Sequence, residues 1–205
     1  MSHRPERRVS VSGGFWLLLG WFVWGCGWRP LLWILAASAA HEAGHYLFLR
    51  AFGAEVRTLR VHILGAVMEA DTSRLSYGQE LMAVLAGPGA NFLCAVAAAL
   101  LGDLWTFCGA NVVLCLFNLL PLQPLDGGRA LYLLLSWRFG TAVGERICTW
   151  IGALCGLFLG TALCLIPVWS GGSLWLLPTA MGLFGAAIAL WKKKREVNIN
   201  IAKNS

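Results

Sequence analysis

Residues 30–52 read PLLWILAASAAHEAGHYLFLRAF, and this stretch decides the fold. It is apolar enough to form a helix in a membrane, yet it carries His41, Glu42 and His45. On a helix, positions i and i+4 lie on one face about one turn apart, so the two imidazoles point the same way. Ionisable groups inside a membrane helix are costly and by default mark a functional site. We therefore expect a functional site buried at membrane depth.

The two histidines are suited to bind one Zn²⁺ per chain. A catalytic zinc takes three protein ligands and leaves a fourth position for water, and Glu42 is placed to act as general base toward that water. The alternative is that His41 and His45 are polar groups satisfied by hydrogen bonds between helices. Asp126 is the predicted third ligand, because it and Glu42 are the carboxylates expected within or at the mouth of the apolar helices.

The composition predicts an all-α polytopic membrane protein. Of the 205 residues, 58% are hydrophobic and only 13% are charged, and the mean hydropathy is +0.67. The net charge of +6 does not indicate direct nucleic-acid binding, because the basic residues lie at the ends of apolar runs. The seven cysteines form no Cys-x-x-Cys pair, so we interpret them as small buried hydrophobes.

The apolar runs predict about six transmembrane helices between a basic cytoplasmic tail (residues 1–12) and a second one (192–205), so that residues 13–191 form the membrane domain. The expected spans are residues 14–27, 31–52, 77–101, 105–120, 147–168 and 174–191. The first is expected to be retained rather than cleaved, because Trp24-Gly-Cys-Gly-Trp28 is a poor cleavage site. A tight turn is expected at Arg29-Pro30, and an interruption of the third span at Gly87-Pro88-Gly89.

Residues 53–72 differ in texture from the spans. Polar and apolar residues roughly alternate there, β-branched residues are common, and Gly65 lies at a natural reversal. This pattern predicts a β-hairpin that lies at the membrane surface or dips in beside the site. His62 falls within it and is expected to be an interfacial or substrate-facing group rather than a zinc ligand.

The basic residues predict the orientation. If the N-terminus is cytoplasmic, six spans place every Lys and Arg except Arg29 on the cytoplasmic side, as the positive-inside rule favours. This topology places both termini, the hairpin, the near end of the zinc motif and Asp126 on that side. We expect an integral protein of a bacterial cytoplasmic membrane with its active-site mouth toward the cytoplasm.

Three motifs together resemble the signature of the site-2 proteases, which are intramembrane zinc metalloproteases. The motifs are His41–His45 in the second span, Gly87-Pro88-x-x-Asn91 in the third, and Asn118-x-x-Pro-x-x-Pro-Leu-Asp126-Gly after the fourth. The ordered set is far more specific than any one motif, and the likeness covers roughly residues 15–190. The sequence is most similar to the branch of stage IV sporulation protein FB, although we expect it to lack that branch's cytosolic regulatory domain.

The resemblance implies an endopeptidase that cuts a membrane-tethered protein within or beside the bilayer. His41, His45 and Asp126 would bind zinc and Glu42 would activate water. Asn118 would help to position the substrate backbone, and Gly87, Pro88 and Asn91 are further candidates for substrate binding, although the glycines are as readily explained by close helix packing. The hairpin would offer an edge strand to an extended substrate. A pro-sigma or anti-sigma factor is one candidate substrate.

Two rival functions remain open. A catalytically silent homologue would keep the fold and capture membrane segments, and a metal-dependent transporter would hold the ion midway along a path. Glu42 favours the enzyme, because a silent relative needs no general base. A transporter would more often carry acidic or histidine residues along several spans.

Overall fold

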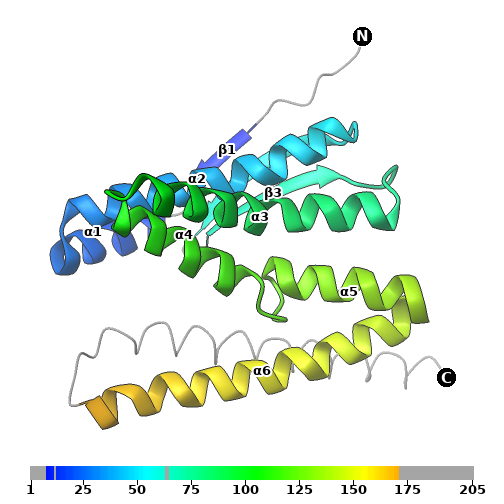
Figure 1. The fold of residues 1–205 in the computed structure, drawn as a ribbon. Coiled ribbons are helices and arrows are strands. Elements are labelled where there is room, and N and C mark those ends of the chain that lie inside the picture. The colour runs from blue at the N-terminus through cyan, green and yellow to red at the C-terminus, as the bar shows by residue number, and fades with distance from the viewer. Residues whose placement is uncertain (1–7, 12, 63–64, 171–205) are drawn as a thin grey trace. The chain divides into compact units, whose positions relative to one another are not determined.

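The computed structural model describes residues 8–11, 13–62 and 65–170. The chain divides into two compact units, residues 1–120 and residues 121–205, and each is described by itself. Figure 1 labels the helices and strands of both units. Most of the described residues are helical, as the composition predicts, and the strands all belong to the first unit.

The elements follow one another in an order close to the predicted one. The first unit contains β1 (Arg8–Val11), α1 (Gly13–Cys26), α2 (Trp28–Ala51), β2 (Glu55–His62), β3 (Gly65–Asp71), α3 (Tyr77–Leu101) and α4 (Trp105–Asn118). The second unit contains α5 (Asp126–Phe139) and α6 (Thr141–Ser170).

The predicted hairpin is present as β2 and β3, which pair antiparallel from Glu55↔Asp71 to His62↔Gly65. A third strand was not predicted. β1 pairs parallel with β2, so β2 is the central strand of a sheet with the order β1-β2-β3. Four residues beside a basic segment carry too little pattern to be identified as a strand, and β1 becomes regular only by pairing with β2.

The boundary between α1 and α2 differs from the predicted turn at Arg29-Pro30. The break is at Gly27, whose φ of 82° lies in the left-handed region, and α2 begins at Trp28. Pro30 therefore lies in the first turn of α2, where its missing N–H would have no intrahelical partner in any case. Glycine at position 27 allows the reversal that was assigned to the proline.

Helices α2, α3 and α4 pack against one another and form the core of the first unit (Figure 1). The backbones of α2 and α3 approach closely at Gly44, where an added Cβ would overlap the carbonyl oxygen of Ala86 and lie 2.9 Å from Cβ of Ala90. Small residues at a crossing allow two membrane helices to come this close. The glycine inside the His-Glu-x-x-His motif is thus required by packing.

Helix α3 has the predicted ends but lacks the predicted interruption. It runs from Tyr77 to Leu101 through Pro88, which is almost completely buried. Proline is tolerated in helices at membrane depth, because neighbouring groups satisfy the backbone positions that it frees. The start of α3 is fixed by a capping box, in which the Ser76 hydroxyl accepts from the Gln79 backbone N–H and the Gln79 side chain accepts from the Ser76 N–H.

Two helices of the described part of the chain are long and apolar enough to cross a membrane. They cover Tyr77–Leu101 and Thr141–Ala162, and α4 is a shorter apolar helix. The predicted sixth span, residues 174–191, lies outside the described residues. The structure therefore supports a helical protein with apolar spans, while the number of six crossings stays a prediction.

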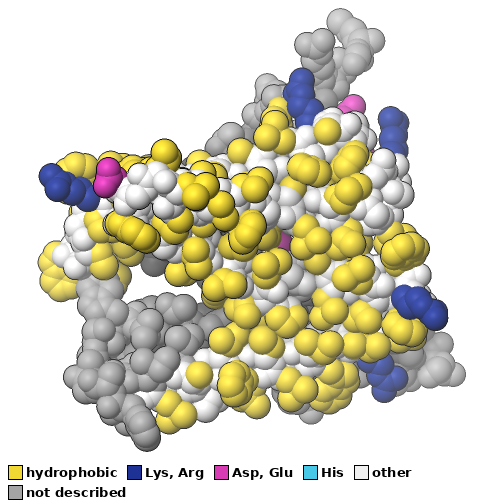
Figure 2. All heavy atoms as spheres, viewed as in Figure 1, with side chains coloured by type: hydrophobic (Ala, Val, Ile, Leu, Met, Phe, Trp, Pro, Cys, Tyr) yellow, Lys and Arg dark blue, Asp and Glu magenta, His cyan; other side chains and the backbone are white. Residues whose placement is uncertain are grey.

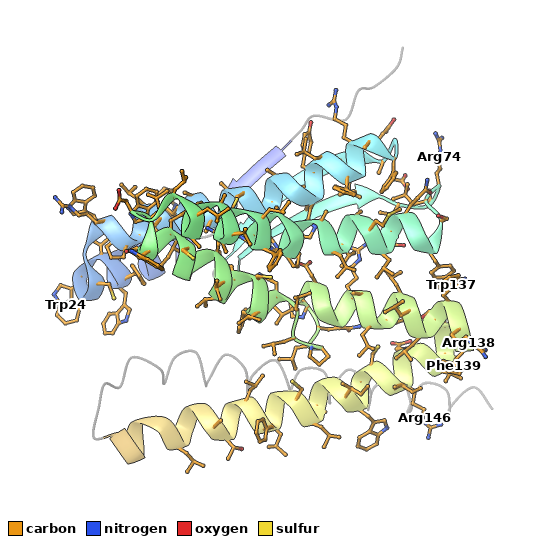
Figure 3. All side chains as sticks on the ribbon, in the orientation of Figure 1. Trp24, Arg74, Trp137, Arg138, Phe139 and Arg146 are labelled. Carbon is orange, nitrogen blue, oxygen red and sulfur yellow. The ribbon has the colours of Figure 1, made fainter. Side chains whose placement is uncertain are left out.

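Hydrophobic side chains cover much of the visible surface (Figure 2). Several large ones are mostly exposed, including Leu93 and Leu100 on α3, Val113 on α4 and Phe158 on α6. In the second unit, α5 ends with Trp137, Arg138 and Phe139, and Arg146 lies near the start of α6 (Figure 3). Exposed apolar surface of this extent is typical of a surface that is covered by lipid or by a partner.

The capping box at Ser76 yields a prediction for stability. Ser76→Ala removes the hydroxyl that accepts from the Gln79 N–H, and we expect the free energy of unfolding to fall by about 1 kcal/mol. The measurement is thermal unfolding in detergent. Ser73→Ala is the matched control, because its hydroxyl donates to the Asp71 carboxylate rather than serving a helix N–H. An equal decrease in both variants would contradict a specific role for the cap.

Candidate metal centre

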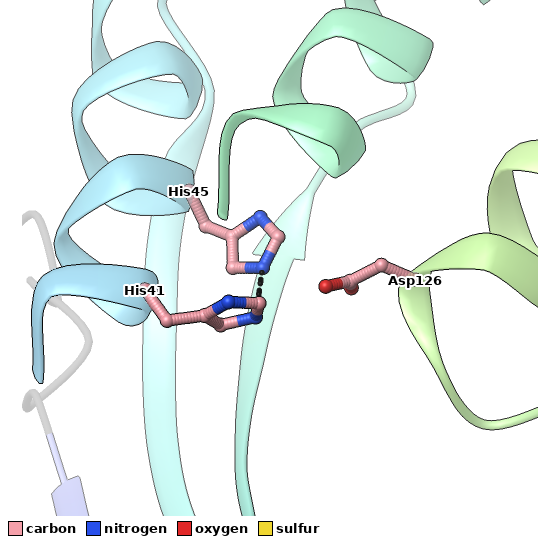
Figure 4. A group of neighbouring side chains, drawn as sticks. All are labelled: His41, His45 and Asp126. Carbon is pink, nitrogen blue, oxygen red and sulfur yellow. Dashed lines mark hydrogen bonds between the residues drawn. The ribbon is translucent and has the colours of Figure 1, made fainter. Parts of the chain in front are cut away.

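Helix α2 presents His41 and His45 on one face, one turn apart. The side chain of His41 is buried and that of His45 is half-buried. Their rings meet edge to face, with centroids 4.7 Å apart, and their Nε2 atoms are separated by 3.1 Å. Figure 4 shows that the two Nε2 atoms face each other. The geometry expected from the i, i+4 spacing is therefore present within the first unit.

The Nδ1 atom of each ring has its own acceptor. In His45, Nδ1 lies 2.9 Å from the backbone oxygen of Ala83 on α3. A carbonyl oxygen can only accept, so this Nδ1 carries the proton and donates it. The lone pair of His45 is consequently on Nε2, the atom that faces His41.

His41 is held by an amide instead. Its Nδ1 lies 2.6 Å from Oδ1 of Asn91, a residue with none of its surface exposed. The Asn91 Nδ2 group donates to the backbone oxygen of Ala37, 2.9 Å away. That bond directs the amide nitrogen toward Ala37 and the amide oxygen toward His41, so the Nδ1 of His41 also donates.

The consequence is that two acceptor nitrogens converge on one place. When both rings donate through Nδ1, each directs Nε2, the nitrogen that remains able to bind a metal, toward the same place. Zinc–nitrogen distances of about 2.0–2.1 Å at a near-tetrahedral angle bring two ligand nitrogens to roughly 3.3 Å from each other. The observed 3.1 Å fits a pair of zinc ligands.

The third predicted ligand is the first residue of α5. Asp126 lies in the second unit, whereas the two histidines lie in the first, so its part in binding the metal stays a prediction. In the second unit, the chain before Asp126 folds back on α5, since a Cβ on Gly128 would lie 2.6 Å from the carbonyl oxygen of Leu122. Glycine at 128 thus allows the loop that presents Asp126 at a helix start, where the dipole favours a carboxylate.

The Gly87-Pro88-x-x-Asn91 motif on α3 lies against the two histidines. A Cβ at Gly87 would overlap the imidazole of His45, with the Cδ2 atom 2.8 Å away. Asn91 holds His41, as described above. The structure thus shows two residues of this motif in contact with the histidines, and their role in substrate binding stays a prediction, as does that of Pro88. The carbonyl of Ala83 was not predicted, because no side-chain pattern marks a backbone acceptor.

The remaining predicted residues are placed less fully. Glu42 follows His41 on α2 and is half-buried. Asn118 ends α4, and its Nδ2 donates to the Leu114 carbonyl of the same helix at 3.0 Å. His62 ends β2, and its side chain lies outside the described part of the chain. The general-base role of Glu42 and the substrate-positioning role of Asn118 stay predictions.

Gly87 gives a test of the zinc site. Gly87→Ala forces the His45 ring to move, so we expect zinc affinity to fall about 10- to 100-fold, the loss typical of a displaced support around a ligand. The measurement is competition with a chromophoric zinc chelator. Alanine is favoured over glycine in a helix, so a loss would not reflect helix propensity.

Gly89→Ala is the matched control on the same helix. A Cβ at Gly89 would meet nothing within 4 Å, so this variant should bind zinc as the unmodified protein does. If Gly87→Ala also bound zinc normally, the space at Gly87 would have no part in placing the ligand.

Comparison with known proteins finds relatives of one kind. Residues 30–107 match Peptidase family M50. The chain is 27% identical over 144 residues to a zinc metalloprotease of Methanocaldococcus jannaschii, covering 64% of this chain and 42% of that protein. It is 26% identical over 140 residues to stage IV sporulation protein FB of Bacillus subtilis, covering 63% and 48%.

The fold also has a solved counterpart. The site-2 protease from Methanocaldococcus jannaschii aligns with a TM-score of 0.67 at 22% identity, covering 92% of this chain and 93% of that one. The matched parts of the two curated relatives amount to less than half of their length. These comparisons confirm the resemblance: the chain is similar to the zinc metalloproteases of Peptidase family M50, the site-2 protease type.

Proposed function

We propose that this protein is an intramembrane zinc endopeptidase that cleaves a membrane-tethered protein within or beside the bilayer. The observation that carries the proposal is the pair of Nε2 lone pairs that converge at 3.1 Å, one residue from a carboxylate. The similarity to zinc metalloproteases supports the same reading.

We propose Asp126 as the third ligand, leaving the fourth position to water. Two histidines and one carboxylate are an established set of ligands for catalytic zinc. Asp126 lies in the first turn of α5 and is preceded by Leu125, whose extended backbone ends the loop. Glycines at 127 and 128, both buried, leave room for the backbone around it.

The proposed chemistry divides the work between the metal and the protein. Bound zinc would polarise the scissile carbonyl and lower the pKa of a water toward neutrality. Glu42 would take the proton from that water and deliver it to the leaving amine. Asn118 would help to hold the substrate backbone at the site. The peptide bond of a helix is shielded, so the substrate segment must unwind before it reaches these groups.

The sheet suggests how an unwound segment is held. β2 is paired on both sides, by β1 and by β3, whereas β3 has a partner on one side only among the described residues. We propose that the substrate adds to the outer edge of β3 as a further strand, which satisfies its backbone groups. The predicted use of the hairpin thus becomes specific to β3.

We propose an integral membrane protein with six spans and both termini in the cytoplasm. Helix α3 and most of α6 are long and apolar enough to cross. At the end of α5, Trp137 and Phe139 are exposed beside Arg138, whose guanidinium lies 5.4 Å from the centre of the Phe139 ring. Aromatic and basic residues are typical of a membrane–water interface, and basic ones of its cytoplasmic side.

The substrate is proposed by class. One of the relatives is a sporulation protein, and a pro-sigma or anti-sigma factor tethered to the membrane is therefore a reasonable first candidate for regulated proteolysis. The silent binding protein and the metal transporter remain the rivals, and the first experiment below separates the enzyme from both.

Glu42→Gln should retain zinc and lose cleavage, because the amide cannot accept the proton of the attacking water. We expect the cleavage rate of a reconstituted single-span test protein to fall by at least about 100-fold. Zinc content should be unchanged. Cleavage at the rate of the unmodified enzyme would remove Glu42 as the base, and zinc binding without any cleavage by the unmodified protein would favour a rival.

Asp126→Ala should lower bound zinc, whereas Asp103→Ala, at an exposed position between α3 and α4, should not. The measurement is metal content of detergent-purified protein, with His41→Ala as the reference for a destroyed site. We expect about one zinc per chain in the unmodified protein, the stoichiometry of a single catalytic site. Unchanged zinc in Asp126→Ala would mean that another group is the third ligand.

A further inference from the structure

Two asparagines form a buried pair between α3 and α4. Asn91 and Asn111 have no exposed surface, and Nδ2 of Asn91 donates to Oδ1 of Asn111 at 2.8 Å. A buried polar group is costly unless its hydrogen bonds are made. Asn111 lies outside the three sequence motifs, so its polarity calls for an explanation of its own.

The polarity of Asn111 is set by its own helix. Its Nδ2 donates to the backbone oxygen of Phe107, one turn earlier on α4, at 2.9 Å. Because that oxygen can only accept, the amide nitrogen must face Phe107, and the amide oxygen must face Asn91. The orientation of Asn111 therefore does not depend on His41.

The polarity of Asn91 then follows. Its two N–H groups have two acceptors, the Asn111 oxygen on α4 and the Ala37 oxygen on α2. If the amide were reversed, its oxygen would face both acceptors with no hydrogen between them. A reversed amide would also present N–H groups to His41 Nδ1, which would then have to accept, and the proton of the ring would be on Nε2. A protonated Nε2 cannot bind a metal.

We propose that Asn111 is a positioning residue for the metal centre: together with the Ala37 carbonyl it holds the Asn91 amide in the orientation that favours the Nδ1-protonated tautomer of His41, in which Nε2 can bind zinc. The proposal rests on the zinc function proposed above. Ala37 alone supplies one acceptor for two N–H groups, and Asn111 supplies the second. The hydrogen bonds run from the Phe107 carbonyl through the Asn111 and Asn91 amides to the His41 ring. A residue of α4 therefore influences the protonation of a zinc ligand on α2.

The alternative to a positioning role is that the hydrogen bond between the two amides only stabilises the packing of α3 against α4. Both roles predict that Asn111→Leu lowers thermal stability, so stability does not separate them. Two other readouts do. One is the zinc dissociation constant, and the other is the tautomer of His41 in the zinc-free protein, read from ¹⁵N chemical shifts of labelled histidine and assigned with His41→Gln.

We expect Asn111→Leu to raise the zinc dissociation constant about 10- to 100-fold, the range found when partners of metal ligands are removed. The Nδ1-protonated form of His41 should lose its dominance. Asn111→Ser, whose hydroxyl can donate to the Phe107 carbonyl and accept from Asn91, should recover part of the affinity. Cys115→Ala is the matched control, because Cys115 is buried on α4 one turn from Asn111; it should leave affinity and tautomer unchanged.

A double variant tests whether Asn111 acts through Asn91. If it does, Asn91→Ala with Asn111→Leu binds zinc as weakly as Asn91→Ala alone, because the second change has nothing left to remove. A further loss in the double variant, or normal affinity and tautomer in Asn111→Leu, would overturn the proposal. Should leucine prevent folding, Asn111→Ala is measured with the same expectations, because alanine also removes the acceptor. Failure of the unmodified protein to bind zinc would overturn the proposed function instead, so the two failures are distinct.

Discussion

The metal centre depends on one constraint, which is that each histidine must donate through Nδ1. In His45 this is imposed directly by the Ala83 carbonyl, and in His41 it is imposed by Asn91. Both constraints come from α3, whereas both ligands come from α2. The close contact of these two helices at Gly44 and Gly87 is therefore part of the metal centre, because a wider separation would lengthen every bond that fixes the rings.

Backbone carbonyls, rather than charged side chains, determine how the histidine rings and the asparagine amides of the site are oriented. A charge buried among apolar helices would be costly, whereas a carbonyl is already present in every helix turn and accepts without changing protonation. The hydrogen bonds of the Asn91 and Asn111 amides extend this fixed orientation across α4, α3 and α2. The polar network is thus neutral, and the charged groups that remain are those proposed to meet the metal and its water.

The sequence predicted a good deal of this arrangement. The ends of α3 were predicted residue for residue, the hairpin was found from its alternation, and the spacing of His41 and His45 placed them on one face. Other features arise only in three dimensions. β1 exists through pairing with β2, Gly87 matters because His45 lies against it, and Asn111 matters because Asn91 does. The predicted interruption at Pro88 was wrong, because the low helix propensity of proline measured in water overstates how far proline disrupts a helix in a helical core.

The parallel pairing of β1 with β2 has a consequence for biosynthesis. A parallel pair cannot close through a short turn, and here both α1 and α2 lie between the strands. During synthesis, β1 is made first, and its pairing with β2 can be completed only once residue 61 has been made. The sheet can therefore form only after both helices, including the one that bears the two histidines, have been synthesised.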